Sequence, residues 1–345
     1  MKIAIINPDW YHFGEKYNYL SSRFFFVQNN CNALFFTKKK FFFRWIYNCL
    51  KTRTPISEIL TNKKVVFKYS KINSNYDILI QFNNPPLNYI EFLKNIKIPK
   101  LVALFDYNYN TRVLSEKLKE INIRHIIGHT RHDLFDPYFK YFFKKNKFEI
   151  VFDYPFGFNN NKNLKNRIDK IVGLGAISRF DRSTEINQLH DYYSFMKDSG
   201  RNYSHLDRLW FRNNSDSITD CFHSYLPSDK VRRNLSFKES TLLPKYSFFL
   251  NDLGSLNFLP ARFFEGIGFS VIPFAKKHSI YEYYGFNEFN MVFFTKNNIN
   301  EIRKNFNEAL ENKENLISNI ELIKTKFNYD NINNNLYENI RKNIN

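Results

Sequence analysis

The sequence predicts an α/β protein with two Rossmann-like domains that face a cleft. Apolar runs of strand length alternate with helix-length segments, which is typical of a parallel sheet covered by helices. This pattern stops at the polar stretch 159–167, NNNKNLKNR, and then restarts with another apolar run. A chain of 345 residues is also long enough for two domains.

The first domain is expected over residues 1–158. Its first strand, at 2–7, ends at the turn signal Pro8-Asp9. Further strands are predicted by apolar runs that end at turn residues, at 65–69, 76–82, 99–105, 123–129 and 149–152. Because ligands bind at the carboxyl ends of parallel strands, the residues that follow these runs are candidates for a site.

The second domain is expected over residues 168–300, after the linker. Strands are predicted at 169–174, 246–250, 269–274 and 291–295, with an amphipathic helix at 184–197. The Arg- and Ser-rich stretch 201–240 has no clear pattern. Residues 301–345 form a C-terminal helical segment expected to pack back toward the N-terminal domain, with an Asn-rich tail after Asn328 that we expect to fray.

The formal net charge of +18 has two interpretations. It indicates a polyanionic partner, nucleic acid or an anionic membrane surface, or it reflects codon bias, since Lys, Asn, Ile and Phe are abundant throughout. The basic and aromatic segment 38–50, KKKFFFRWIYNCL, could likewise face a membrane or nucleic acid, or be a helix with its aromatic residues in the core.

The cysteines Cys31, Cys49 and Cys221 are widely spaced, so we expect packing residues in a reducing compartment. The first apolar run is too short for a signal peptide, and no stretch approaches 18 apolar residues. We expect a cytoplasmic protein, either soluble or peripheral at the inner membrane face, with no obligate protein partner.

Two strand ends of the second domain suit a phosphate. Gly173-Leu-Gly-Ala-Ile-Ser178-Arg179 and the nearby Arg182 follow one strand, and small residues let the backbone approach an anion. Gly254, Ser255, Arg262 and Glu265 follow another. An Arg262-x-x-Glu265 spacing puts both side chains on one helix face, where they could form a surface ion pair or bind a phosphate and a ribose diol.

In the first domain, Asp106 directly follows a predicted strand. It could act as a general base at the cleft, or it could be the N-cap of the next helix. Asp9 follows a predicted strand and His129 lies at the end of one, and both could line the cleft or contact an acceptor. His125, His129 and His132 have no metal-binding spacing, so no metal site is expected. The sequence also has no G-x-S-x-G and no Walker loop.

These motifs, in this order, resemble the GT-B glycosyltransferases, and within them the T-even phage DNA glucosyltransferases. The resemblance is carried by MKIAIIN at the start, LFD ending at Asp106, FEIVFDYPF at the domain junction, the loop with Ser178, Arg179 and Arg182, and Ala261-Arg262-Phe-Phe-Glu265. It implies that Asp106 deprotonates the acceptor, that the three arginines hold a UDP diphosphate, and that Glu265 binds the ribose. Asn257 stands where retaining GT-B families often carry the first glutamate of a Glu-x7-Glu pair.

The resemblance thus implies transfer of a hexose, with glucose expected, from a UDP-sugar to an acceptor hydroxyl, on modified DNA bases in the first interpretation. The UDP-sugar is a substrate, and neither a tightly bound cofactor nor a divalent metal is expected. In one alternative the acceptor is a membrane-associated surface glycan, lipopolysaccharide or capsule. In another, the protein is a basic nucleic-acid-binding protein without catalysis, which would bind DNA in a salt-sensitive way but not UDP.

Overall fold

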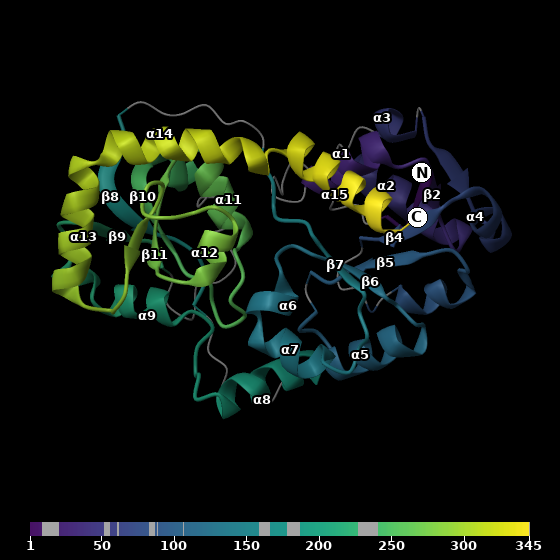
Figure 1. The fold of residues 1–345 in the computed structure, drawn as a ribbon, viewed down its shortest axis with the longest axis horizontal. Coiled ribbons are helices and arrows are strands. Elements are labelled where there is room, and N and C mark those ends of the chain that lie inside the picture. Colours follow the sequence, from purple (N-terminus) through teal and green to yellow (C-terminus); the bar gives the residue numbers. More distant parts are fainter. Residues whose placement is uncertain are drawn as a thin grey trace. The chain divides into compact units, whose positions relative to one another are not determined.

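The computed structural model describes residues 1–8, 21–51, 56–60, 62–82, 87, 89–105, 107–158, 166–177, 187–226 and 241–344. The chain forms two compact units, each with its own parallel sheet (Figure 1). Unit 1 comprises Met1–Gly157, Ile186–Tyr192 and Tyr329–Asn345, and unit 2 comprises Phe158–Glu185 and Tyr193–Asn328. Residues 301–328 thus belong to unit 2 and only the last segment of the chain to unit 1. The domain limits derived from the sequence remain a prediction.

Unit 1 is built on a seven-stranded parallel sheet in the order β3-β2-β1-β4-β5-β6-β7. The order reverses between β1 and β4, as in doubly wound folds. Its central strands are apolar and buried, as expected for a sheet covered on both faces. The strands are β1 Ile3–Ile6, β2 Ala33–Phe35, β3 Lys64–Val66, β4 Ile78–Gln81, β5 Lys100–Ala103, β6 His125–Gly128 and β7 Ile150–Asp153.

Helix α7 of unit 1 begins where the sequence provides a capping group. Asp136 Oδ1 accepts hydrogen bonds from the amides of Tyr138 (2.8 Å) and Phe139 (3.1 Å), and Pro137 takes the first position of α7. The helices are α1 Ser21–Asn30, α2 Lys39–Lys51, α3 Ile56–Leu60, α4 Tyr69–Asn75, the 3₁₀ helix Ile90–Asn95, α5 Thr111–Glu120, α6 His132–Phe135, α7 Pro137–Phe143 and α15 Tyr329–Asn343.

The expectation that the tail after Asn328 frays is wrong. The helix α15 lies beside α1 (Figure 1) and buries Tyr329, Ile332, Leu336 and Ile340. These positions follow helical spacing, so Asn331, Asn334, Asn335 and Asn339 occupy the exposed outer face, whereas Asn333 is buried with the apolar stripe. An apolar stripe therefore decides the structure of a segment whose composition alone suggested disorder.

Unit 2 is built on a five-stranded parallel sheet in the order β12-β11-β10-β8-β9. Its order reverses between β8 and β10, and the central β10 is buried along its whole length. The strands are β8 Ile168–Gly173, β9 Phe222–Ser224, β10 Tyr246–Asn251, β11 Ile272–Lys276 and β12 Val292–Phe294. Strand β9 lies in the stretch that the sequence left without a pattern.

The strands predicted at 246–250 and 269–274 are confirmed by β10 and β11, which pair in parallel and are joined by α11, the helix that carries Arg262 and Glu265. The helices of unit 2 are α9 Leu206–Asn213, α11 Ala261–Gly268, α12 Ser279–Tyr283, α13 Ile299–Glu311 and α14 Lys313–Lys324, and α8 His190–Asp198 links the two units along the chain. Within the described residues, no helix is both long and apolar enough to cross a membrane.

Candidate functional site

An open pocket lies at the carboxyl ends of β10 and β11, beside the point where the strand order of unit 2 reverses. It has a volume of about 170 Å³. This edge is where parallel α/β sheets bind their ligands. Three cations, two carboxylates and several neutral polar groups share its wall. The lining residues are Arg201, Ser204, Leu206, Asp207, Asn251, Asp252, Leu253, Gly254, Asn257, Lys276, Lys277, His278 and Tyr281.

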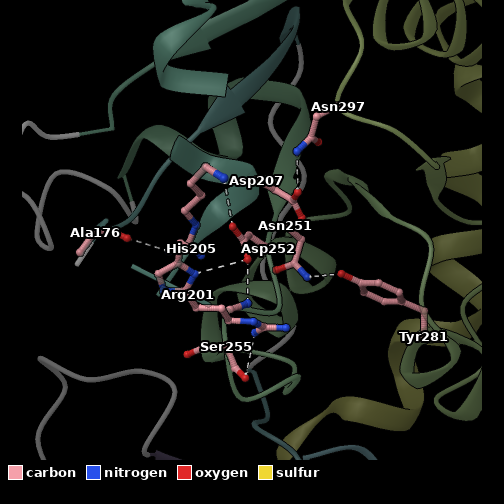
Figure 2. Close-up of polar contacts among 11 residues, drawn as sticks. Ala176, Arg201, His205, Asp207, Asn251, Asp252, Ser255, Tyr281 and Asn297 are labelled. Atoms are coloured by element: carbon pink, nitrogen blue, oxygen red, sulfur yellow. Dashed lines mark hydrogen bonds and ion pairs between the residues drawn. The ribbon is translucent and has the colours of Figure 1, made fainter. Parts of the chain in front are cut away.

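Asp252 is the polar centre of this region (Figure 2). Its Oδ2 accepts a 3.0 Å hydrogen bond from the amide of Arg208, and its Oδ1 accepts a 2.7 Å bond from the amide of Gly254. The Nδ1 of His205 lies 3.5 Å from Oδ1. The buried carboxylate thereby ties the start of α9 to the loop after β10.

The pKa values of the two carboxyls of the pocket are shifted in opposite directions. Burial raises the pKa of Asp252, but His205, Arg208 and the backbone amide of Arg208 outweigh it, so the pKa lies below its ordinary value. Burial raises the pKa of Asp207, and the charge of Asp252 adds to this rise. Asp252 is therefore an ionised structural anchor, whereas Asp207, which accepts a hydrogen bond from Asn297 (3.1 Å), is more readily neutralised.

Arg208 connects the ends of the two strands at the reversal point. Its side chain is buried and Nη1 donates to the carbonyl of Ala176, 3.3 Å away, in the loop after β8. A Cβ on Gly175 would lie 2.6 Å from the same Nη1, and Gly175 has φ +106°. Glycine is thus required for both the backbone conformation and the close approach of the guanidinium.

The loop after β10 contains two of the predicted donor-site residues. Gly254 lines the pocket at φ +67°, and a Cβ there would lie 2.9 Å from Cε1 of His205. Ser255 is buried and its carbonyl accepts a 3.2 Å hydrogen bond from Nη1 of Arg201. Gly254 therefore contributes backbone to the pocket wall, and Ser255 positions a cation that lines it.

Arg262 and Glu265 lie on α11, in its first two turns. Both side chains are half-buried, and Nη1 of Arg262 is buried. Neither residue lines the pocket described above. The structure therefore places them after the same strand as Gly254 and Ser255 but does not bring their side chains into this pocket.

The other predicted site residues, Asp9, Asp106, Ser178, Arg179 and Arg182, lie outside the described residues. His129 directly follows β6 in unit 1. Its ring is 5% exposed and contacts Phe105, Phe156 and His132, at centroid separations of 5.6, 4.7 and 5.0 Å. The side chain thus belongs to an aromatic cluster at the carboxyl edge of its sheet.

Several pocket residues were not predicted from the sequence. Lys276 ends β11 and Lys277 and His278 follow it, as Asn251 ends β10 and Asp252 follows it, so the polar break after the run Phe269 to Phe274 was a usable signal. Arg201 and Asp207 gave no such signal, because they lie in the stretch without a pattern. Over the described ranges, His, Cys, Asp and Glu side chains form no group of three or more that could hold a metal ion.

No family model and no curated protein matches the sequence. Solved structures match it over nearly its whole length. The HepE protein of Anabaena in complex with UDP is 11% identical with a TM-score of 0.54, and the matches cover 99% of this chain and 100% of that one. Its complex with UDP-glucose gives 12% identity, a TM-score of 0.51 and the same coverage. A glycosyltransferase from Rickettsia africae gives 9%, a TM-score of 0.50 and 99% of both chains.

At such low identity these similarities show the fold alone. Two parallel sheets of seven and five strands, with these structural neighbours, confirm the predicted α/β class and the GT-B fold.

Proposed function

We propose that the protein is a nucleotide-sugar-dependent glycosyltransferase that transfers a hexose, with glucose as the expected sugar, from a UDP-sugar to an acceptor hydroxyl. The observation that carries this proposal is the cation-lined pocket at the carboxyl ends of β10 and β11, in a chain with the GT-B fold. The HepE structures in complex with UDP and UDP-glucose support the choice of donor.

Arg201 and Lys276 suit a diphosphate. Both lie close enough to Asp207 to lower its pKa against the effect of burial, so their charges converge on one part of the pocket. The neighbouring Lys277 is held by Glu288, with 2.7 Å between Nζ and Oε1, and contributes less free charge. Arginine and lysine side chains that meet at a strand end stabilise a departing diphosphate electrostatically.

The remaining roles come from the resemblance of the sequence. Arg262 would bind the diphosphate together with Arg179 and Arg182, next to Ser178, and Glu265 would bind the ribose. Asp106 would act as the general base that takes the proton from the attacking hydroxyl. The positive charge that neutralises the departing diphosphate is then supplied by side chains, and the proposal requires no bound metal.

Titration of UDP into the protein, followed by calorimetry, tests the donor site. Arg201→Ala and Lys276→Ala should each weaken UDP binding by about ten-fold, the loss of roughly one charge-assisted hydrogen bond. Lys304→Ala, an exposed lysine on α13, is the matched control and should bind like wild type. No binding of UDP to the wild-type protein would overturn the proposal.

Two further variants separate binding from chemistry. Arg262→Ala should abolish UDP binding, whereas Asp106→Asn should keep it and lose transfer. Unchanged UDP affinity of Arg262→Ala would show that Arg262 does not bind the donor. Full activity of Asp106→Asn would show that Asp106 is not the general base.

The acceptor requires its own assay. Release of UDP from UDP-glucose should be stimulated either by duplex DNA with a hydroxyl-bearing modified base or by a lipid-linked glycan. The DNA acceptor rests on the sequence motifs, and the glycan acceptor is favoured by the surface of α2 described below. If neither acceptor stimulates UDP release, both proposed acceptors are wrong, and only the assignment of the UDP-sugar donor is retained.

A further inference from the structure

Helix α2 of unit 1 has two apolar faces, and only one of them packs against the protein. Trp45 and Cys49 are buried, and Trp45 contacts Phe36 at a ring separation of 5.7 Å. On the other face, the side chains of Phe43, Tyr47 and Leu50 are 65%, 64% and 65% exposed. These three residues, the outer stripe, are four and then three positions apart, so they lie along one line on the helix.

Exposed cations border the outer stripe on both sides. At about 100° per residue, Lys39 falls on one side of the stripe, and Lys40, Arg44 and Lys51 fall on the other. The sequence has no Asp or Glu between Glu15 and Glu58, so no acidic residue of this stretch offsets them. The outer face of α2 is therefore an apolar line between basic borders.

The apolar surface continues beyond the helix. Phe67, just after β3, is 37% exposed, and its ring lies 5.8 Å from that of Phe42 on α2. The next residue, Lys68, is exposed as well. Aromatic rings with adjacent cations thus extend the same pattern from α2 to the edge of the unit 1 sheet.

We propose that α2 docks this protein on the surface of an anionic lipid bilayer. Phe43, Tyr47 and Leu50 enter the boundary between headgroups and acyl chains, and the basic borders contact lipid phosphates. An interfacial helix combines an apolar line with Lys and Arg on its flanks, and a helix of 13 residues is too short to span a bilayer. Docking explains why three large apolar side chains share one water-exposed face.

The charge distribution favours lipid over nucleic acid. A groove for a nucleic-acid backbone would place cations along its centre, whereas here Leu50 and two rings occupy the centre and the cations stand at the border. An anionic lipid bilayer can contact both features of α2, because its phosphates bind the basic borders and its acyl chains contact the outer stripe.

Sedimentation of the full chain with vesicles tests the proposal. The probes are vesicles of phosphatidylcholine with about one third phosphatidylglycerol, and vesicles of phosphatidylcholine alone. We expect the anionic vesicles to bind at least about ten-fold more tightly, and added salt to reduce this difference. Equal binding to both kinds of vesicle, or no binding to either, would overturn the proposal.

Matched triple variants localise the contact. Phe43→Ser/Tyr47→Ser/Leu50→Ser should lose at least about ten-fold in affinity for the anionic vesicles, because the residues that enter the bilayer are gone. The control is Phe289→Ser/Tyr283→Ser/Leu322→Ser, the same residue types at exposed positions of unit 2, and it should bind like wild type. Equal losses in both variants would show that general apolar exposure, and not α2, drives binding.

Two measurements keep the result interpretable. Thermal unfolding of both triple variants should match wild type, because the replaced side chains are exposed, and UDP binding should be unchanged, so failure here is distinct from failure of the donor-site proposal. Binding of labelled duplex DNA gives the competing outcome. If the α2 variant loses DNA affinity and keeps vesicle affinity, the face binds nucleic acid and the lipid proposal is wrong.

Discussion

The hydroxyl of Tyr154 donates a 2.7 Å hydrogen bond to Oδ1 of Asn333, although 179 residues separate the two in sequence. Both side chains are buried. The bond joins the residue after β7 to α15, so the last helix of the chain becomes part of the core of unit 1. Burial makes the bond costly to break, because each group would lose its partner away from water.

Asn333→Ala should lower the free energy of unfolding by about 1–3 kcal/mol, since the Tyr154 hydroxyl is left buried without this acceptor. Chemical denaturation followed by tryptophan fluorescence measures it. Asn334→Ala, at an exposed position of the same helix, is the control and should change stability by less than about 0.5 kcal/mol. Equal effects of the two replacements would contradict a specific role for the buried bond.

Sequence periodicity was sufficient to predict the two sheets and most of their strands. Runs such as Tyr246 to Leu250 are apolar except for Ser247, because both faces of a parallel sheet are covered. Strands β2 and β9, of three residues each, were not predicted. Strands β3 and β12 are equally short but overlap the predicted runs 65–69 and 291–295, so strand length alone did not decide what the sequence could predict about the fold.

The candidate site was predictable only where polar residues directly follow a strand. Gly254 and Ser255 follow β10 and were found in this way. Arg201 and Arg208 instead lie in the long segment between β8 and β9, far in sequence from the ends of both strands. Arg208 is positioned by contacts with Ala176 and Asp252, which are 32 and 44 residues away. Such long-range pairing leaves no local signal in one sequence.

Gly254→Ala should weaken UDP binding by about ten-fold or more and destabilise the protein by about 1–3 kcal/mol. An alanine is strained at the φ of +67° that this turn has, and its Cβ would press on His205. Gly200→Ala is a close control, because Gly200 also has a positive φ, +72°, but a Cβ there would meet nothing within 4 Å. The control should therefore show backbone strain without the loss of UDP affinity. Calorimetry measures the UDP affinity of both variants, and thermal unfolding measures their stability. Equal UDP affinities of the two variants would contradict the proposal that the turn at Gly254 shapes the UDP pocket.

His132 should make the stability of unit 1 sensitive to acid. Burial lowers the pKa of His132 from 6.5 to about 3 in the folded protein. The unfolded chain therefore binds a proton that the folded chain does not between these values, and stability falls as the pH decreases through this window. The slope is about 1.4 kcal/mol per pH unit below 6.5.

His132→Gln removes this proton linkage. The variant should be less stable than wild type near pH 7, where the neutral ring is well packed against Tyr107 and Phe139. The difference in the free energy of unfolding between wild type and the variant should be about 2 kcal/mol smaller at pH 5 than at pH 7. Denaturation at a series of pH values measures it, and a gap that stays constant from pH 7 to pH 4 would refute the linkage.

Arg208→Met should destabilise unit 2 by about 3–5 kcal/mol at neutral pH, because Asp252 would stay buried without the charge that helps to hold its pKa low. The folded pKa of Asp252 is lowered, so its contribution to stability is present above the ordinary value of 3.8 and is lost as the pH falls. The loss of stability in the variant should consequently become smaller in acid.

A double-mutant cycle tests whether Arg208 acts through Asp252. The loss of stability in Arg208→Met/Asp252→Asn, measured by denaturation, should be smaller than the sum of the losses in the two single variants. Arg212→Met on the same helix is the control for loss of an arginine. Strictly additive effects of the two replacements would mean that Arg208 acts through the Ala176 carbonyl alone and not through Asp252.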